Sequence, residues 1–371
     1  MVRRLLGVRL DNAGDVLLAG PAVRAMAARC DELVVLAGPH GVGAAKLLPG
    51  VNDVMVWRCP WIDAGRPAVD TDDISSLVDQ IRQRSFDAAV VFTSFHQSAL
   101  PTALLLRLAG VSWVGAISDD YPGSLLDLRH HVDDNIPEAQ RALSLAAEAG
   151  YLLPPADDGR LEVRRPLPDV SHLVGEDPYL VLHPGTSVPA RAWPVHRFAE
   201  CSQQLSTLGW RVVVTGAPSE AHLTEAVASP GSLGSPGSLS SPGLATSAGP
   251  RVLDLGGRTS LPELAAVLAG ATVVVVGNTG PAHLAAAVGT PVVSLFAPTV
   301  PAARWAPYGV PHILLGDQQA ACRDTRATRC PIPGHPCLTS VTAHDVCEAV
   351  TELVGDRQAE HPTVQLEEVA Q

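Results

Sequence analysis

The chain has 371 residues, of which 46% are hydrophobic and 17% charged, and its formal net charge at pH 7 is −12. This length suits two domains, and the apolar fraction excludes a largely disordered chain. The acidic balance argues against extended contacts with duplex nucleic acid, which need clustered cations. Aromatic residues make up only 4%, which disfavours a base-stacking platform and favours an aliphatic core of helices on parallel strands.

The first half of the chain alternates short apolar runs with helix-like segments. Such alternation is typical of a parallel sheet covered by helices on both faces. It predicts an α/β, Rossmann-like domain over residues 1–165. We expect strands over residues 3–10, 33–36, 54–57, 88–92 and 113–116, and helices over residues 16–30, 74–81, 100–108 and 139–149.

A proline-rich connection over residues 151–178 interrupts this alternation, which then restarts. A second Rossmann-like domain is therefore predicted over residues 176–355. Within it, residues 229–250 repeat Ser-Pro-Gly, and this composition predicts a surface insertion loop because Pro and Gly at such density cannot sustain a helix. We expect strands over residues 179–183, 211–214, 252–255, 272–276 and 292–295, and helices over residues 195–208, 219–228, 261–269 and 281–288.

The sequence lacks clear signals for a membrane span, a signal peptide, a disulfide framework or a zinc site. No apolar run approaches the roughly 18 residues of a membrane span, and no signal peptide is evident. We expect a cytoplasmic protein, with the inner face of the membrane left open as a second location. The seven cysteines form a poor disulfide framework. One segment contains possible zinc ligands, namely Cys322, Cys330, His335 and Cys337. Their spacing lacks paired Cys-x-x-Cys units, so ordinary loop thiols are favoured over a zinc site.

An Asp-x-Asp pattern at Asp70 and Asp72 formally matches the metal-diphosphate signature of some transferases. It directly precedes a predicted helix. We therefore interpret it as helix capping by Asp72 or Asp73, and we expect no metal ion at the active site.

Open α/β sheets bind ligands beyond the carboxyl ends of their strands, so loops that directly follow strands are the candidate sites. The first such loop, residues 11–15, runs through Gly14 into a helix. A glycine turn at a helix N-terminus can admit an anion or a sugar close to the backbone. Asp15 either serves that site or is an ordinary acid favoured by the helix dipole.

The loop over residues 183–194 follows the first strand of the second domain. It offers the backbone N–H groups, hydroxyls and cation that a diphosphate needs. A Pro/Gly turn with Arg191 in solvent explains the same residues equally well. The next strand ends in Thr215 and Gly216, which fit either a ligand pocket or a tight turn.

The most informative pattern covers residues 272–299. An apolar strand ends in a turn over residues 277–280, and Pro281 suits the first position of the helix that follows. The N–H groups at the start of such a helix bind phosphate without a lysine. His283 lies one turn into this helix, where it either faces the ligand or is a structural or solvated residue.

Taken together, these segments resemble glycosyltransferase family 9, the ADP-heptose lipopolysaccharide heptosyltransferases and their relatives. The resemblance spans roughly residues 3–350. The family's motifs are matched by residues 14–21 (Gly-Asp and a later Pro), 183–194 (His-Pro-Gly, a basic residue and Trp-Pro), 277–291, 296–299 and 330–337. The resemblance implies a GT-B fold and a metal-independent, inverting transfer from an ADP-activated, heptose-like donor, with no cofactor.

The resemblance also implies roles for individual residues. Asp15 would be the general base that deprotonates an acceptor hydroxyl, Arg191 would pair with the donor diphosphate, and the N–H groups of Thr279 and Gly280 would cap it. The implied donor-binding residues are His183, Gly185, Thr186, Arg191, Trp193, Thr215, Gly216, Asn278, Thr279, Gly280 and His283. Asn278 stands where the family commonly carries Asp, which changes a hydrogen bond to the donor because Asn donates as well as accepts.

The acceptor side is expected in the first domain, and its chemistry is generic. Loops over residues 93–97 and 118–123 follow predicted strands, and their polar groups either meet acceptor hydroxyls or form ordinary surface loops. The acceptor is expected to be a saccharide, a lipid-linked molecule or a small molecule. The candidate residues on this side are Asn12, Gly14, Ser94 and His96.

Two other functions remain open at this point. The chain is alternatively a non-catalytic GT-B protein that binds a nucleotide sugar, or an epimerase or hydrolase of nucleotide sugars on the same fold. The presence of both Asp15 and Arg191 favours the transferase, because a protein that only binds needs no base.

Overall fold

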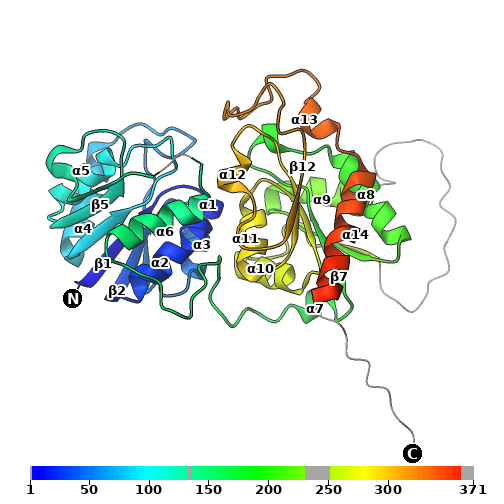
Figure 1. The fold of residues 1–371 in the computed structure, drawn as a ribbon, viewed down its shortest axis with the longest axis horizontal. Helices are drawn as coiled ribbons and strands as arrows, with labels where there is room; N and C mark the ends of the chain where they lie inside the picture. Colours follow the sequence, from blue (N-terminus) through cyan, green and yellow to red (C-terminus); the bar gives the residue numbers. More distant parts are fainter. Residues whose placement is uncertain (1, 133–134, 230–250, 361–371) are drawn as a thin grey trace, which may run out of the picture.

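The structure is a computed structural model that describes residues 2–132, 135–229 and 251–360. Two lobes lie side by side, each built on a six-stranded parallel sheet (Figure 1). The sheets lie within the two predicted domain ranges, so the α/β architecture is confirmed. The first sheet contains β1 (Val2–Arg9), β2 (Cys30–Ala37), β3 (Asp53–Val56), β4 (Ala88–Val91), β5 (Trp113–Ile117) and β6 (Leu128–His130); the second contains β7 (Tyr179–His183), β8 (Arg211–Val214), β9 (Val252–Asp254), β10 (Val274–Gly277), β11 (Val292–Leu295) and β12 (His312–Leu315).

Helices cover both sheets. α1 and α11 face each other where the lobes meet, and the connection between the lobes runs along one side of the molecule to α7 (Figure 1). The helices of the first lobe are α1 (Ala13–Leu18), α2 (Gly20–Ala27), α3 (Val42–Leu47), α4 (Thr71–Arg84), α5 (Leu100–Leu108) and α6 (Glu138–Glu148). Those that follow are α7 (Ser171–Val174), α8 (Val195–Thr207), α9 (Ala221–Ala228), α10 (Leu261–Gly270), α11 (Gly280–Val288), α12 (Ala302–Trp305), α13 (Pro336–Thr339) and α14 (Ala343–Glu360), with short 3-10 turns η1 (Gly123–Leu125), η2 (Pro189–Arg191) and η3 (Pro218–Glu220).

Both sheets have the same strand order, β3-β2-β1-β4-β5-β6 in the first and β9-β8-β7-β10-β11-β12 in the second. Each sheet has a central pair of strands, β1 and β4 in the first and β7 and β10 in the second. The strands that follow the first member of the pair extend the sheet to one side, and those that follow the second member extend it to the other. The loops after these central strands diverge at the carboxyl edge and leave a crevice in which open α/β sheets bind ligands. The strand order therefore places four loops at the junction of the lobes.

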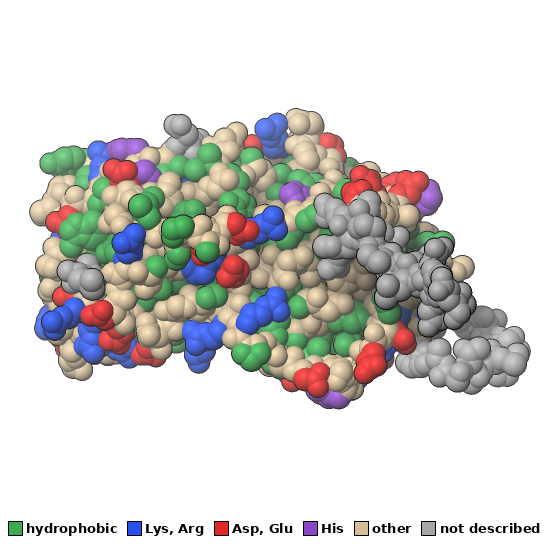
Figure 2. Space-filling model, turned by 60° about the horizontal axis from the view of Figure 1, so that its bottom comes forward, with side chains coloured by type: hydrophobic (Ala, Val, Ile, Leu, Met, Phe, Trp, Pro, Cys, Tyr) green, Lys and Arg blue, Asp and Glu red, His purple; other side chains and the backbone are tan. Residues whose placement is uncertain are grey.

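The core is aliphatic, as the composition predicts. The central strands β4, β7, β10 and β11 are buried along their whole length, which explains why they are runs of Val, Ala and Leu rather than alternating patterns. On the face shown in Figure 2, acidic and basic side chains are interspersed and form no broad patch of one sign. No helix within the described ranges is long and apolar enough to cross a bilayer.

Three expectations about local structure need correction or restriction. The helix expected over residues 16–30 is two helices, because Pro21 lacks the N–H that would continue α1 into α2. The residue that caps α4 is Asp70, not Asp72 or Asp73: its Oδ1 accepts from the N–H groups of both, at 2.8 and 3.2 Å. The predicted insertion over residues 229–250 lies, apart from residue 229, outside the described residues.

Candidate active site

A cavity of about 160 Å³ lies where the two crevices face each other. From the first lobe, the loop after β1 and the start of α1 contribute to its wall; from the second, the loop after β7 and the N-terminus of α11 do. The lobes approach closely at Gly14, because a Cβ there would lie 2.9 Å from Cδ2 of His283 and 3.3 Å from the Cα of Gly280. The lining residues are Asn12, Gly14, Asp15, Ser187, Val188, Arg191, Asn278, Thr279, Gly280, His283, Val300 and Trp305.

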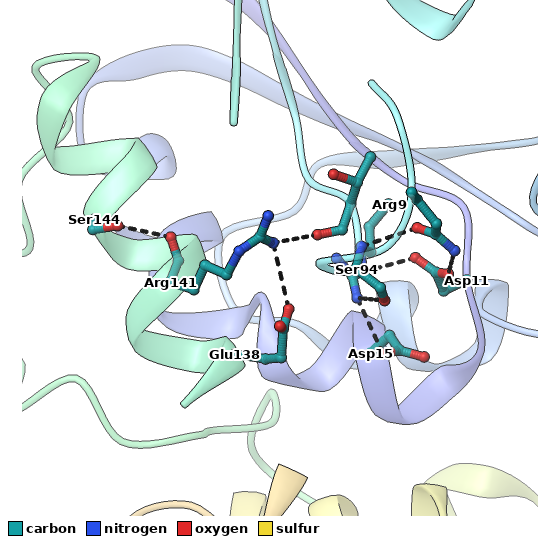
Figure 3. A network of polar contacts seen from close by, with 9 residues as sticks. Arg9, Asp11, Asp15, Ser94, Glu138, Arg141 and Ser144 are labelled. Atoms are coloured by element: carbon teal, nitrogen blue, oxygen red, sulfur yellow. Dashed lines mark hydrogen bonds and ion pairs between the residues drawn. The ribbon is translucent and has the colours of Figure 1, made fainter. Parts of the chain in front are cut away.

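Asp15 lies in the first turn of α1, with its side chain 20% exposed toward this cavity. Its Oδ1 accepts a hydrogen bond of 3.0 Å from Nη2 of Arg9, the last residue of β1. The same guanidinium also donates to Ser94 Oγ at 2.9 Å and pairs with Asp11 at 3.1 Å (Figure 3). The carboxylate of Asp15 is thus held from behind by a buried arginine that also contacts Ser94 and Asp11.

Arg191 faces Asp15 across the cavity and has a different environment. It lies at the end of η2, is partly buried, and donates from Nη1 to the backbone carbonyl of Asn278 at 3.3 Å. Burial lowers the pKa of Arg191, and no ion pair with any described residue offsets that cost. A partly buried cation beside the N-terminus of α11 makes this side of the cavity favourable for negative charge, because the N–H groups at the start of the helix and the helix dipole act in the same sense.

Three buried polar atoms around the cavity have no hydrogen-bond partner among the described residues: Nε of Arg191, Nδ2 of Asn278 and Nδ1 of His283. Asn278 and His283 are each only 3% exposed. Burial lowers the pKa of His283 to about 4, so its imidazole is neutral near pH 7. Buried polar groups in native proteins are normally satisfied, so these three atoms indicate a polar ligand in the cavity.

A second cavity of about 320 Å³ adjoins the first, and Ser187, Thr279 and Gly280 line both. Its remaining wall comes from the loops after β7 and β8 and from the start of α10. Glu220, which follows β8, presents a carboxylate to it, and Gly185 leaves the space for that carboxylate because a Cβ there would overlap it.

His183 lines the second cavity, and Thr215 lies behind it. His183 Nδ1 and Thr215 Oγ1 lie 2.9 Å apart in a hydrogen bond. Burial lowers the pKa of His183 to about 4, so this imidazole is also neutral near pH 7. Thr215 is completely buried behind the imidazole and does not line either cavity.

A third cavity, of about 770 Å³, lies beside the loop after β4. His96 and Gln97 from that loop line it together with Trp61, while Arg326 and Thr328 reach it from the second lobe. Ser94, from the same loop, is buried and bonded to Arg9 rather than exposed in the cavity.

The structure thus brings most of the sequence-predicted site residues to one region, although Thr215 and Ser94 lie behind the cavity walls and Trp193 lies apart from them. Trp193 lies in the hydrophobic core of the second lobe, 3% exposed, packed edge-on against Phe198. Its indole N–H donates to the carbonyl of Val341 at 3.1 Å, so the side chain does not line the cavities.

Several residues that shape the site were not singled out from the sequence. Glu220 comes from the loop after β8, and its place directly after a strand is the signal that could have identified it. Gln97 lies in the loop over residues 93–97, which the sequence had pointed to. Arg9 ends an otherwise apolar strand, and a charge at that position was the only sequence indication of its role. Trp305, on α12, carries no such signal, because its place in the first cavity depends on how the lobes pack.

The cysteine-rich segment shows no metal-site geometry. Within the described residues, the only cluster of potential ligands close enough to hold an ion is the acidic group Asp157, Asp158 and Glu162.

The comparisons with known proteins agree with this geometry. The sequence profile of "Glycosyltransferase family 9 (heptosyltransferase)" matches residues 74–334. Among curated proteins, no sequence matches the chain significantly.

Solved structures of similar fold cover nearly the whole chain. A glycosyltransferase of family 9 from Veillonella parvula DSM 2008 is 16% identical with a TM-score of 0.75, covering 95% of this chain and 98% of that one. The ADP-heptose lipopolysaccharide heptosyltransferase II of E. coli is 19% identical, with a TM-score of 0.69 and coverage of 96% and 99%. The heptosyltransferase WaaC of E. coli, solved with ADP-2-deoxy-2-fluoro heptose, is 23% identical, with a TM-score of 0.65 and coverage of 94% and 99%.

These similarities confirm the expected GT-B fold, and the profile match covers more than half of the chain. With two parallel sheets facing across a polar cavity, the chain belongs to glycosyltransferase family 9 and is a glycosyltransferase.

Proposed function

We propose that this glycosyltransferase moves a heptose or related sugar from an ADP-sugar to a hydroxyl of a cell-envelope or metabolite acceptor, with inversion and without a metal ion. One observation carries the proposal: Asp15 and Arg191 face each other across one cavity and come from opposite lobes. A base and an unneutralised cation in that arrangement suit a displacement at a carbon between them.

In the proposed reaction, Asp15 accepts the proton of the acceptor hydroxyl as its oxygen attacks the anomeric carbon of the donor. The bond between that carbon and the diphosphate oxygen breaks on the opposite face, so the configuration inverts. Arg191 and the N–H groups at the start of α11 stabilise the negative charge that develops on the leaving ADP. The proton stays on Asp15 and the bonding electrons leave with the diphosphate, so no metal ion is required.

The donor would occupy both smaller cavities. A nucleotide sugar is too large for the cavity of about 160 Å³ alone, whereas the adjoining cavity of about 320 Å³ gives space for the nucleoside. The unpartnered Nδ2 of Asn278 and Nδ1 of His283 would then bond to the sugar and the diphosphate. Glu220 would accept hydrogen bonds from donor hydroxyls in the second cavity.

The acceptor would enter through the cavity of about 770 Å³. This cavity lies beside the loop over residues 93–97, which carries Ser94 and contacts the Asp15 network from the first lobe. Trp61 offers an apolar face for a sugar ring, and His96 and Gln97 offer polar groups for its hydroxyls. An acceptor seated there has one end directed toward the lobe junction.

The donor assignment is tested by calorimetric titration with ADP, GDP, UDP and dTDP, followed by incubation with ADP-heptose. We expect ADP to bind most tightly, and Arg191→Ala to weaken ADP binding by about 10- to 100-fold because a charge-assisted contact to the diphosphate is lost. Arg197→Ala is the matched control, since Arg197 pairs with Glu200 on α8. Preference for another nucleotide would overturn the donor, and an Arg191→Ala variant with normal ADP affinity would overturn the role of Arg191.

A further inference from the structure

A continuous line of polar contacts joins the largest cavity to the carboxylate that faces the smallest one. It begins at Gln97, which lines the cavity of about 770 Å³. Gln97 Nε2 donates to Asp11 Oδ1 at 2.5 Å, and Gln97 Oε1 accepts from the N–H of Ser94 at 2.9 Å. A single side chain from the loop after β4 thus holds both an acid of the β1 loop and a backbone group of its own loop.

Arg9 connects Asp11 to Asp15. Its side chain is 5% exposed, that of Asp11 is 9% exposed, and both lie behind the cavity walls. Arg9 Nε pairs with Asp11 Oδ2 at 3.1 Å, and Arg9 Nη2 donates to Asp15 Oδ1 at 3.0 Å. Arg9 therefore spans two carboxylates with two edges of one rigid, planar group (Figure 3).

The charges around Arg9 favour this arrangement. Burial alone would lower the pKa of Arg9, but the carboxylates of Asp11 and Asp15 outweigh it, so the pKa of Arg9 is raised and the guanidinium stays charged. Glu138 and Arg141 on α6 close the buried side, where Arg141 lies 3.6 Å from Glu138 (Figure 3).

Among the described residues, the hydrogen bond to the side chain of Asp15 is accepted by Oδ1, which leaves Oδ2 available, and Asp15 lines the cavity. From the second lobe, Arg191 and His283 face the same carboxylate at longer range, as does His96 from the first. Only Arg9 among these groups donates a hydrogen bond to it in the described chain. The direction of Oδ2 is therefore set by Arg9.

We propose that Arg9 is the positioning residue of Asp15, and that Gln97, acting through Asp11 and Arg9, links occupation of the larger cavity to the position of the base. The proposal rests on the proposed function, in which Asp15 is the base and the larger cavity takes the acceptor. Neither Arg9 nor Asp11 touches the substrates. A displacement of the base by about 1 Å is enough to lower the rate by about 100-fold.

The test compares Arg9→Lys with Arg24→Lys. Lysine keeps the charge but cannot span two carboxylates, so Arg9→Lys should release ADP from ADP-heptose about 10- to 100-fold more slowly with unchanged ADP affinity. Arg24 is a matched control, because it is also buried in the first lobe and pairs with Asp157 through two hydrogen bonds of 2.6 and 2.7 Å, away from the cavities. Arg24→Lys should lower the melting temperature and leave the rate unchanged.

A crystal structure of Arg9→Lys gives a second measurement that needs no acceptor. We expect the Asp15 carboxylate to change rotamer or occupy two positions. An unmoved carboxylate, or ADP release at the wild-type rate, overturns the proposal. If Asp15→Asn itself keeps the wild-type rate, it is the proposed function that fails, which separates the two.

The link to the larger cavity is tested with Gln97→Ala, using Gln80→Ala as its control. Gln80 is an exposed residue of α4 that bonds to Ser76. Gln97→Ala should lower the maximal rate several-fold, because the hydrogen bonds that hold Asp11 and the loop of Ser94 are both lost, rather than only raise the KM of an acceptor. An effect confined to KM would show that Gln97 only contacts the acceptor and would overturn the link.

Discussion

Two arginines flank the first cavity, and their surroundings differ. Arg9, on the side of the first lobe, is bonded to Asp15 and Ser94 and paired with Asp11. Arg191, on the side of the second lobe, donates one long hydrogen bond to a backbone carbonyl and forms no ion pair with a described residue. A buried charge is costly unless it is paired, so the two arginines cannot serve the same purpose.

The difference indicates that the two lobes have different roles in the site. In the first lobe, Arg9 bonds to Asp15 and pairs with Asp11, which holds a carboxylate in place before any substrate binds. The second lobe keeps buried donors without partners in the described chain, which an anionic ligand would satisfy. Chemistry should therefore depend on the first lobe and donor affinity on the second.

The largest expected effect is that of Asp15→Asn. Loss of the base should lower the release of ADP from ADP-heptose by about 10³-fold, with no change in ADP affinity, because Asp15 belongs to the first lobe. Asp119→Asn is the control, since that side chain is 91% exposed in the same lobe. A variant that loses ADP affinity along with its rate would show that the division between the lobes is wrong.

A fall in pH should lower the free energy of unfolding of the second lobe, because two of its histidines are buried in the neutral form. Burial lowers the pKa of both His183 and His283 to about 4, below the value of 6.5 for an ordinary imidazole. The unfolded chain binds more protons between these two values, so the free energy of unfolding falls as the pH drops through this window. Each histidine contributes up to about 3 kcal/mol of that loss.

Urea unfolding at a series of pH values measures this effect. His283→Gln should flatten the pH dependence because it removes one of the titrating groups. His222→Gln, an exposed position on α9, should leave the dependence unchanged. An unaltered slope in His283→Gln would mean that this imidazole is not kept neutral by the fold.

The smallest of the three effects concerns the contact between the lobes. A Cβ on Gly14 would lie 2.9 Å from Cδ2 of His283, so Gly14→Ala should hold the lobes slightly apart. We expect the rate to fall by about 10-fold with ADP affinity intact. Gly20→Ala is the control, because its Cβ would meet only Leu48 Cδ2, at 3.4 Å within the first lobe. Equal rates for the two variants would show that the lobes do not need this close approach.

Much of the fold was predictable from local sequence. Strands such as β7 and β11 were located correctly because a run of Val and Leu between turn residues leaves few alternatives. The strands β6 and β12 were missed because their residues are only partly buried, which gives no clear apolar pattern. The end of α1 was missed because Pro21 was treated as part of a continuous helix.

The candidate site was predictable in part, from loops that follow strands. Gly14, Asp15, Arg191 and the start of α11 are brought together as the positions of their loops suggested. The resemblance implies a place for Trp193 in the donor site, whereas in the structure its indole lies in the core, against Phe198 and hydrogen-bonded to the carbonyl of Val341.

The sequence by itself determined the alternation of strands and helices, the aliphatic core and the loops that carry the chemistry, because these depend on neighbours along the chain. The tertiary structure alone decided that β1 lies beside β4 and β7 beside β10, and that the two crevices face each other. Arg9 finds Asp11 and Asp15 close by in the chain, but its contact with Ser94 and the contact of Arg191 with Asn278 join residues 85 and 87 positions apart and follow from that packing. Pairing across such distances depends on which faces can be buried together, and no local pattern records it.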